Sequence, residues 1–140
     1  MTTDPLSAIS RLAGAGLEAQ AHRLKIVAEN MANVRSTGTA PGADPYRRRT
    51  IVFETVLDRE IGARSVEVDK ISEDPTPFRV EHLPGHPAAD ADGYVKLPNV
   101  NMLIEMADMQ EANRTYEANL QMIGHARSMA GQLLDLIRSR

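Results

Sequence analysis

The chain has 140 residues, with 16 Lys and Arg against 19 Asp and Glu, for a formal net charge of −3. This length suffices for one ordinary domain, and the mild negative charge argues against general binding to nucleic acids or anionic membranes. The absence of cysteine excludes disulfides, thiol catalysis, iron–sulfur clusters and cysteine-ligated zinc. Aromatic residues make up only 4% of the chain, so burial has to rely on aliphatic side chains and methionine.

Targeting signals are not expected in this sequence. The first residues, MTTDPLSAIS, contain neither a basic region nor the apolar stretch of a secretory signal peptide. Nowhere does the chain approach the roughly 20 consecutive apolar residues that a transmembrane helix needs. We therefore expect a protein that does not span a membrane and carries no cleaved signal peptide.

Residues 1–34 predict a long N-terminal helix. Asp4 can cap it, and Pro5 suits the first helical position. Mostly apolar residues then recur at alternating spacings of four and three, which is typical of a helix that packs lengthwise on another helix. This first stripe consists of Ala13, Leu17, Gln20, Leu24, Val27, Met31 and Val34.

Residues 35–98 predict a β-rich and extended insert. They hold seven of the eight prolines, and their proline–glycine clusters indicate turns. β-branched and aromatic residues predict strands over residues 46–57 and 65–71, with residues 78–82 as a candidate third strand. Since two or three short strands enclose little core, the insert is expected to depend on the helices or on partners.

Residues 99–140 predict a second, longer helix without proline. Asn99 or Asn101 can cap it, and Glu105 adds negative charge to the first turn, as the helix dipole favours. The same alternating spacing continues over about five heptads. This second stripe consists of Met102, Met106, Met109, Asn113, Tyr116, Leu120, Ile123, Arg127, Ala130, Leu134 and Ile137.

Four glycines interrupt these helices and leave two interpretations open. They are Gly14, Gly16, Gly124 and Gly131, and each costs about 1 kcal/mol relative to alanine in a helix. Either neighbouring backbones pack closely at these positions, or the helices become ordered only when they pack on other subunits.

No motif in the sequence indicates catalysis, a cofactor or a small-molecule substrate. Neither a nucleophile elbow nor a glycine-rich phosphate loop is present, and the carboxylates are spread along helix faces instead of pairing in an apolar pocket. His82 and His86 precede Asp90 and Asp92, but Pro84 prevents the helix that would align the histidines for a metal. A solvated loop is the favoured interpretation, and we expect no metal site.

The run Arg47–Arg49 is the basic feature of the insert. On a strand, successive side chains point to opposite faces, so these arginines do not form one phosphate-binding surface, and nucleic-acid binding is not expected. The alternatives are an exposed strand or a contact with an acidic neighbour in an assembly.

Two long stretches resemble the signatures of the flagellar rod and hook proteins. The first is AENMANVRSTGTAPGADPYRRRT at 28–50, with Asn30, Ala32 and Asn33 followed by a Thr-Gly turn. The second is GYVKLPNVNMLIEMADMQEANRTYEAN at 93–119. The stretches DPYRRR and GHPAADADGYVKLPNVN are similar, more narrowly, to proteins of the proximal rod. Together with the terminal helices, the resemblance covers nearly the whole chain.

The resemblance implies a mainly α fold with a small β insert, in which the two terminal helices pair as an antiparallel coiled coil. It also implies a structural subunit that assembles with copies of itself and other rod proteins into the axial drive shaft and export channel. Such a subunit passes unfolded through the flagellar type III export apparatus and resides in the rod, in the periplasmic space. From the residue pattern alone, a soluble two-helix adaptor or export-chaperone-like binding module is the alternative.

The stripes and the signatures together predict the residues that make assembly contacts. The asparagines among them are expected to fix the register between helices and subunits, because buried amides need defined partners. For Asn33 and Asn99, a turn or cap role is favoured. The predicted assembly residues are Leu17, Leu24, Val27, Asn30, Met31, Asn33, Asn101, Met102, Met106, Met109, Asn113, Tyr116, Asn119, Leu120, Ile123, Leu134 and Ile137.

Overall fold

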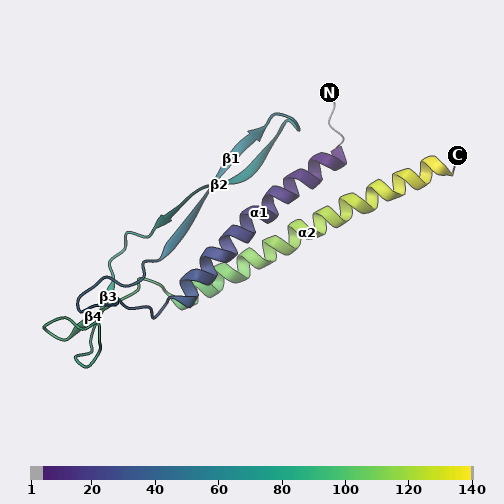
Figure 1. Cartoon of the computed structure of the whole chain (residues 1–140). Helices are drawn as coiled ribbons and strands as arrows, with labels where there is room; N and C mark the ends of the chain where they lie inside the picture. Colours follow the sequence, from purple (N-terminus) through teal and green to yellow (C-terminus); the bar gives the residue numbers. More distant parts are fainter. Residues whose placement is uncertain (1–4, 140) are drawn as a thin grey trace.

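The computed structural model describes residues 5–139 as two long helices joined by two β-hairpins (Figure 1). In chain order the elements are α1 (Pro5–Ala32), β1 (Arg49–Asp58), β2 (Ala63–Glu73), β3 (Arg79–His82), β4 (Tyr94–Leu97) and α2 (Met102–Arg138). The helices lie side by side and run in opposite directions, which confirms the mainly α fold with a small β insert. The predicted cap Asp4 lies outside the described residues.

The two helices pack along a seam that three residue pairs define. The pairs are Asn30 with Glu105, Arg23 with Asp108, and Gly16 with Asn119. A Cβ atom at Gly16 would lie 2.7 Å from Nδ2 of Asn119, so at this position the Asn119 side chain that packs against α1 explains the glycine. No atom lies within 4 Å of a Cβ built at Gly14, Gly124 or Gly131, apart from the local helix itself.

The seam of α1 differs from the first stripe in one of its two rows. Ala13 and Val27 are buried, as the stripe predicts. The stripe also predicts that Leu17, Leu24 and Met31 face α2, but these three side chains stay partly exposed. In their place, Gly16 and Asn30 are buried, on the other side of Ala13 and Val27.

The seam of α2 likewise lies to one side of the second stripe that the sequence predicts. Ala112 and Ala126 are buried at the heptad spacing of Glu105, whereas Leu120 and Leu134 are 54% and 58% exposed. The physical reason is that small residues and paired polar side chains fill the seam, and the small ones at Gly16, Ala112 and Ala126 let the two helices approach closely. The large aliphatic side chains of both stripes therefore lie beside the seam.

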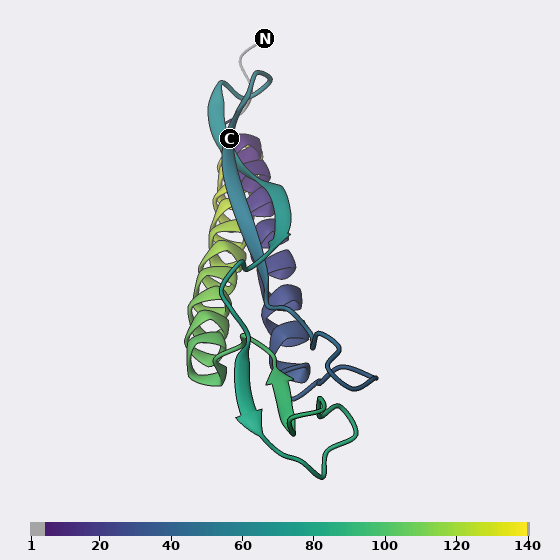
Figure 2. The same cartoon turned by 90° about the vertical axis from the view of Figure 1, so that its left-hand side faces the viewer.

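The hairpin of β1 and β2 lies along α1, on the side away from α2 (Figures 1 and 2). Its strands pair antiparallel from Arg49 opposite Glu73 to Asp58 opposite Ala63, with a register shift at Val52 and Phe53. This arrangement places α1 between the hairpin and α2. Both predicted strands are confirmed, with slightly different ends.

The hairpin of β3 and β4 lies beyond the end of the helix pair. The candidate strand at 78–82 is present as β3, while β4 was not predicted because its four residues stand isolated between Gly93 and Pro98. Gly93 has a φ of 83°, which favours glycine at this turn, and Val95 of β4 is fully buried. Within residues 5–139, neither helix is long and apolar enough to cross a membrane.

Candidate functional site

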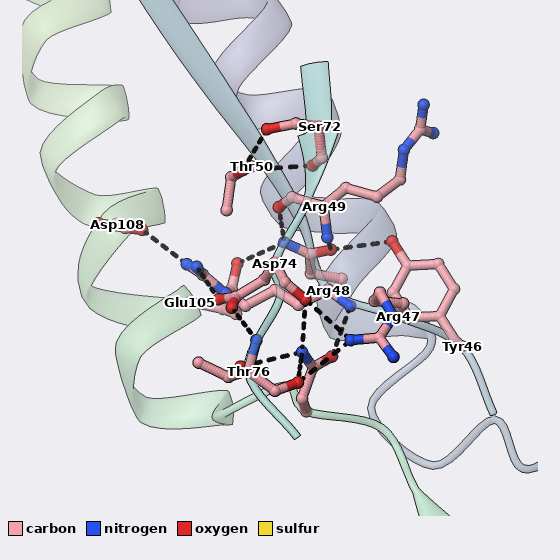
Figure 3. Close-up of polar contacts among 12 residues, drawn as sticks. Tyr46, Arg47, Arg48, Arg49, Thr50, Ser72, Asp74, Thr76, Glu105 and Asp108 are labelled. Atoms are coloured by element: carbon pink, nitrogen blue, oxygen red, sulfur yellow. Dashed lines mark hydrogen bonds and ion pairs between the residues drawn. The ribbon is translucent and has the colours of Figure 1, made fainter. Parts of the chain in front are cut away.

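A polar cluster around two buried side chains, Asn30 and Glu105, joins the insert to the two helices (Figure 3). It forms where α1 ends, where α2 begins, and where the segments on either side of the β1–β2 hairpin pass between them. We call this cluster the polar junction. Its members are Asn30, Tyr46, Arg48, Asp74, Asn99 and Glu105.

Glu105 of α2 lies at the centre of the polar junction and is fully buried. Its Oε1 accepts a hydrogen bond from Nε of Arg48 at 2.6 Å, and its Oε2 accepts one from Nδ2 of Asn30 at 3.0 Å. A buried carboxylate is costly unless it is paired and hydrogen-bonded, and here both oxygens have partners. Glu105 therefore connects the insert and α1 at a single carboxylate.

Asn30 of α1 uses its whole side-chain amide. Nδ2 donates to the carbonyl oxygen of Arg49 at 2.9 Å as well as to Glu105, while Oδ1 accepts from the Arg49 amide at 2.9 Å and the Tyr46 hydroxyl at 2.8 Å. Burial is the main cause that raises the pKa of Tyr46, so this hydroxyl remains a donor at neutral pH. Asn30 thereby fixes the backbone of the first residue of β1 against α1.

Asn99, which precedes α2, holds the two ends of the hairpin together. Its Oδ1 accepts from the Arg48 amide at 2.7 Å, and its Nδ2 donates to the carbonyl oxygens of Asp74 and Thr76 at 3.1 and 3.0 Å. Asn99 therefore does not cap α2. The cap is Asn101, whose side chain accepts from the amide of Leu103 at the start of α2.

Asp74 closes the polar junction from the side of β2. Its Oδ1 accepts from the Thr76 amide at 2.9 Å, and its Oδ2 lies 3.2 Å from Nη1 of Arg48. The hydrogen bonds from Thr76, followed by the Arg48 guanidinium, hold the pKa of Asp74 below its usual value. Asp74 is therefore a second anionic partner of Arg48.

The other predicted asparagines have separate local environments. Asn33 donates to the carbonyl oxygen of Glu29 at 2.8 Å and accepts from the Ser36 hydroxyl, in agreement with the favoured role at the end of α1. Asn119 lies over Gly16 in the seam, and Asn113 is exposed. Of the five asparagines expected to fix register, Asn30 is the one in the polar junction.

The predicted assembly residues with larger side chains are distributed around the helix pair. Val27 is buried, and a second group is partly exposed: Leu17, Leu24, Met31, Met109, Tyr116 and Ile123. A third group is exposed: Met102, Met106, Leu120, Leu134 and Ile137. Their role in assembly stays a prediction.

The sequence does not predict the two carboxylates of the polar junction, Asp74 and Glu105. Glu105 was assigned to the helix dipole, and no carboxylate was expected in a buried pair, yet Glu105 is fully buried against Arg48. The expected acidic neighbour of the arginine run is in the same chain: Arg48 pairs with Glu105, and Arg49 lies 2.9 Å from Glu29. A signal was available, because Glu105 is the one charge within MLIEM and follows the helix start by three residues.

The histidine-containing loop shows no arrangement for a metal ion. Nδ1 of His86 accepts from the amide of Ala88 at 3.1 Å, and the His82 ring stands edge-on to Tyr94 at 5.0 Å between centroids. Across the described residues, no group of three or more His, Asp or Glu side chains is placed to hold a metal.

Comparison with known proteins identifies the family. Residues 91–136 match the family model described as flagellar basal body rod FlgEFG protein C-terminal. The flagellar basal-body rod protein FlgC of Agrobacterium fabrum is 56% identical over 97% of this chain and 98% of its own length. The FlgC proteins of Yersinia enterocolitica and Borreliella burgdorferi are 39% and 37% identical, over 89% and 91% of this chain and 92% and 94% of their own lengths.

These matches confirm the resemblance that the two signatures indicated, and with it the prediction of a structural protein without enzymatic activity. The second signature falls within the matched C-terminal region, together with Asn99 and Glu105 of the polar junction. The chain belongs to the FlgC family of flagellar basal-body rod proteins.

Proposed function

We propose that this chain is a structural subunit of the proximal rod, which packs its helix pair against neighbouring rod subunits to build the axial drive shaft and export channel. One observation carries the proposal. Large apolar side chains of both helices lie beside the seam, partly exposed on α1 and exposed on α2, and we call them the outer stripe. The outer stripe consists of Leu17, Leu24, Met31, Met106, Leu120 and Leu134.

The two halves of the outer stripe share one side of the helix pair. Asp108 contacts both Arg23 of α1 and Arg48 of the insert, so its row on α2 faces the hairpin side of the seam. Met106 lies two residues earlier, on the opposite flank of the seam. On α1, Gly16 contacts α2, and Leu17, Leu24 and Met31 lie on the other side of the buried residues Ala13 and Val27. The outer stripe therefore faces away from the hairpin.

This surface has the properties of a subunit contact. Met106, Leu120 and Leu134 are 45%, 54% and 58% exposed, and burying such a side chain fully contributes about 1.5–3 kcal/mol. Large apolar side chains that gather on one side of a folded chain are typical of an interaction site, and here the exposed Asn113 and Arg127 separate those of α2. When one surface docks against a different surface of the next subunit, the contact repeats and generates an open helical assembly.

The remaining parts of the proposal rest on the family. We place the subunit in the periplasmic part of the rod, with other rod proteins as its neighbours and the flagellar type III export apparatus as its route out of the cytoplasm, without a cleaved signal peptide. No nucleic acid and no small-molecule ligand enter the proposed function.

Complementation in a motile bacterium tests the proposal. An Agrobacterium fabrum strain without its own FlgC, whose protein is 56% identical, would receive either this chain or the variant Leu120→Glu/Leu134→Glu. We expect this chain to restore swimming and rods in isolated basal bodies, and the double variant to abolish both. The matched control is Gln110→Glu/Gln121→Glu, which adds the same two charges at exposed positions of α2 outside the outer stripe and should still swim. Swimming of the leucine double variant would contradict a role of the outer stripe in assembly.

A concentration series separates the rod subunit from the alternative adaptor. A self-assembling subunit should form larger species in size-exclusion chromatography as its concentration rises, with low helicity when dilute. A two-helix adaptor should elute as the same monomer or dimer, with constant helicity by circular dichroism, at every concentration.

A further inference from the structure

The β1–β2 hairpin is attached to α1 at two places of unequal strength. At its base, β1 and β2 lead into the polar junction, where the buried side chains of Asn30 and Glu105 hold Arg48 and Arg49. At its tip, Arg11 of α1 lies 3.4 Å from Asp58 and 2.6 Å from Glu60. The side chains of Arg11 and Glu60 are 48% and 74% exposed, so water and salt screen this second attachment.

The middle of the hairpin is separated from α1 by a groove. The groove has a volume of about 310 Å³ and is lined by Ala15, Glu18, Ala19 and His22 of α1 and by Val66, Glu67 and Val68 of β2. Its helix wall contains small alanine side chains beside Glu18 and His22, which leave part of the space between α1 and β2 unfilled at mid-length. The base of the hairpin, by contrast, has fully buried partners.

Two like charges act on the hairpin at this groove. Glu18 of α1 and Glu67 of β2 line opposite walls, and Glu67 stands directly across the hairpin from Glu54 of β1. Repulsion between Glu18 and Glu67 across the groove favours a larger separation between α1 and the hairpin, and it is weak because both side chains are exposed. Glu54 and Glu67 move together when the tip lifts, so their repulsion does not depend on that separation.

A bend point lies between the firm base and the weak tip. The register shifts between Val52 and Phe53, so that Asp69 of β2 has no partner on β1. Such a bulge disrupts the ladder locally and bends the strand that carries it. The part of the hairpin beyond the bulge can move while the part before it stays fixed.

We infer that the β1–β2 hairpin is a strap, hinged near the bulge and held at the polar junction, whose tip lifts from α1 while its base stays attached. Lifting the tip uncovers Ala15 and Ala19 of α1 and Val66 and Val68 of β2. The helix pair then has a second apolar surface, on the side opposite the outer stripe. The strap thus controls how many sides of α1 can receive a neighbour.

Spin-label distances in the full chain test this inference, and the absence of cysteine makes the labelling sites unique. A tip pair is placed at Gly14→Cys and Arg59→Cys, and a base pair at Ala28→Cys and Lys70→Cys. These substitutions use a helical position with open space around it and three exposed positions. We expect two distance populations for the tip pair and a single narrow population for the base pair.

Charge variants give opposite expectations for the same measurement. Arg11→Ala should raise the long-distance fraction of the tip pair by roughly two- to fivefold, as expected for loss of an exposed ion pair. Glu67→Gln should lower that fraction because it removes the repulsion, and Arg64→Ala, an exposed arginine near the tip, should leave it unchanged. A single narrow tip distance that Arg11→Ala does not alter would overturn the inference, as would joint movement of both pairs. Rod assembly is not measured here, so this test stands apart from the proposed function.

Discussion

Nε of Arg48 donates to Oε1 of Glu105 at 2.6 Å, although the two residues are 57 positions apart in the chain. This bond connects the segment before β1 to the first turn of α2, with the carboxylate fully buried. Asn30 reaches the same carboxylate from α1, so one side chain joins three segments. The polar junction therefore couples the position of the insert to the pairing of the helices.

Removing Arg48 tests that coupling. Arg48→Ala leaves the buried Glu105 carboxylate without its cation, and removal of one partner from such a pair costs about 3–5 kcal/mol. We expect this decrease in the free energy of unfolding, measured by urea denaturation at neutral pH. The matched control is Arg49→Ala, whose side chain pairs with Glu29 in a solvent-exposed setting and contributes about 0–1 kcal/mol. Equal losses for the two variants would contradict the assignment.

Two neighbouring glycines of α1 should respond to alanine in opposite directions. Gly16→Ala places a Cβ atom 2.7 Å from Nδ2 of Asn119, and the overpacking, offset by about 1 kcal/mol of helix propensity, should leave a net destabilisation of about 0.5–2 kcal/mol. Gly14→Ala meets no atom within 4 Å and should stabilise the helix by about 0.5–1 kcal/mol. Thermal unfolding of both variants measures the difference. Adding Asn119→Ala to Gly16→Ala should restore stability, and a failure of this rescue would show that the seam contact is not the cause.

Asp74 predicts a pH dependence of stability. The pKa of this carboxyl is lowered in the folded chain, mainly by hydrogen bonds from Thr76 and then by Arg48. Its contribution is therefore complete above the unfolded value, near 3.8, and is lost as the pH falls through the lower folded value. Urea denaturation from pH 7 to 3 should show a stability gap between the wild type and Asp74→Asn that narrows below pH 3.8. A constant gap would contradict this role.

Much of the fold could be predicted from the sequence because its periodicity is strong. The stripe spacing identified both long helices, and β-branched runs identified β1 and β2 within a few residues. The isolated strand β4 was missed because its four residues have no extended alternating pattern. The spacing does not determine which face of each helix turns toward the other helix. Residues on either side of Val27 or Ile123 fit the same alternating spacing of four and three.

The polar junction was harder to predict because its bonds join distant segments. Asn30 was selected from the signature, but nothing local shows that its amide pairs with the backbone of Arg49. Glu105 fits the charge preference of a helix start equally well when exposed, so its burial becomes visible only when the insert is in place. The choice of Gly16 over Leu17 for the seam likewise depends on how closely the helices approach.

Deletion of the C-terminal part of α2 should separate folding from assembly. Leu133, Leu134, Leu136 and Ile137 are 53–72% exposed, so loss of residues 129–140 removes little that the described chain itself buries. We expect the shortened chain to stay soluble and to fail in rod assembly and swimming. The matched control is Gly131→Ala, which keeps this segment and adds a methyl group in open space. Normal swimming of the deletion strain would contradict assembly through this segment.

Replacement of the loop histidines should have almost no effect. In His82→Ala/His86→Ala, one ring contact with Tyr94 and one hydrogen bond from the amide of Ala88 are lost. Rod assembly and swimming should be retained within measurement error. A strong defect that chelators reproduce in the wild type and that added metal reverses would instead support a metal site in the loop.

The central claim is that this chain is a rod subunit whose outer stripe contacts its neighbours. An electron cryomicroscopy map of basal bodies from the complemented strain tests it most directly, because the helix pair and the hairpin can be placed in the density. We predict α1 and α2 in the wall of the rod, with Leu120 and Leu134 buried against the next subunit. Density for the chain outside the rod, or an outer stripe that faces solvent in every subunit, would contradict the account.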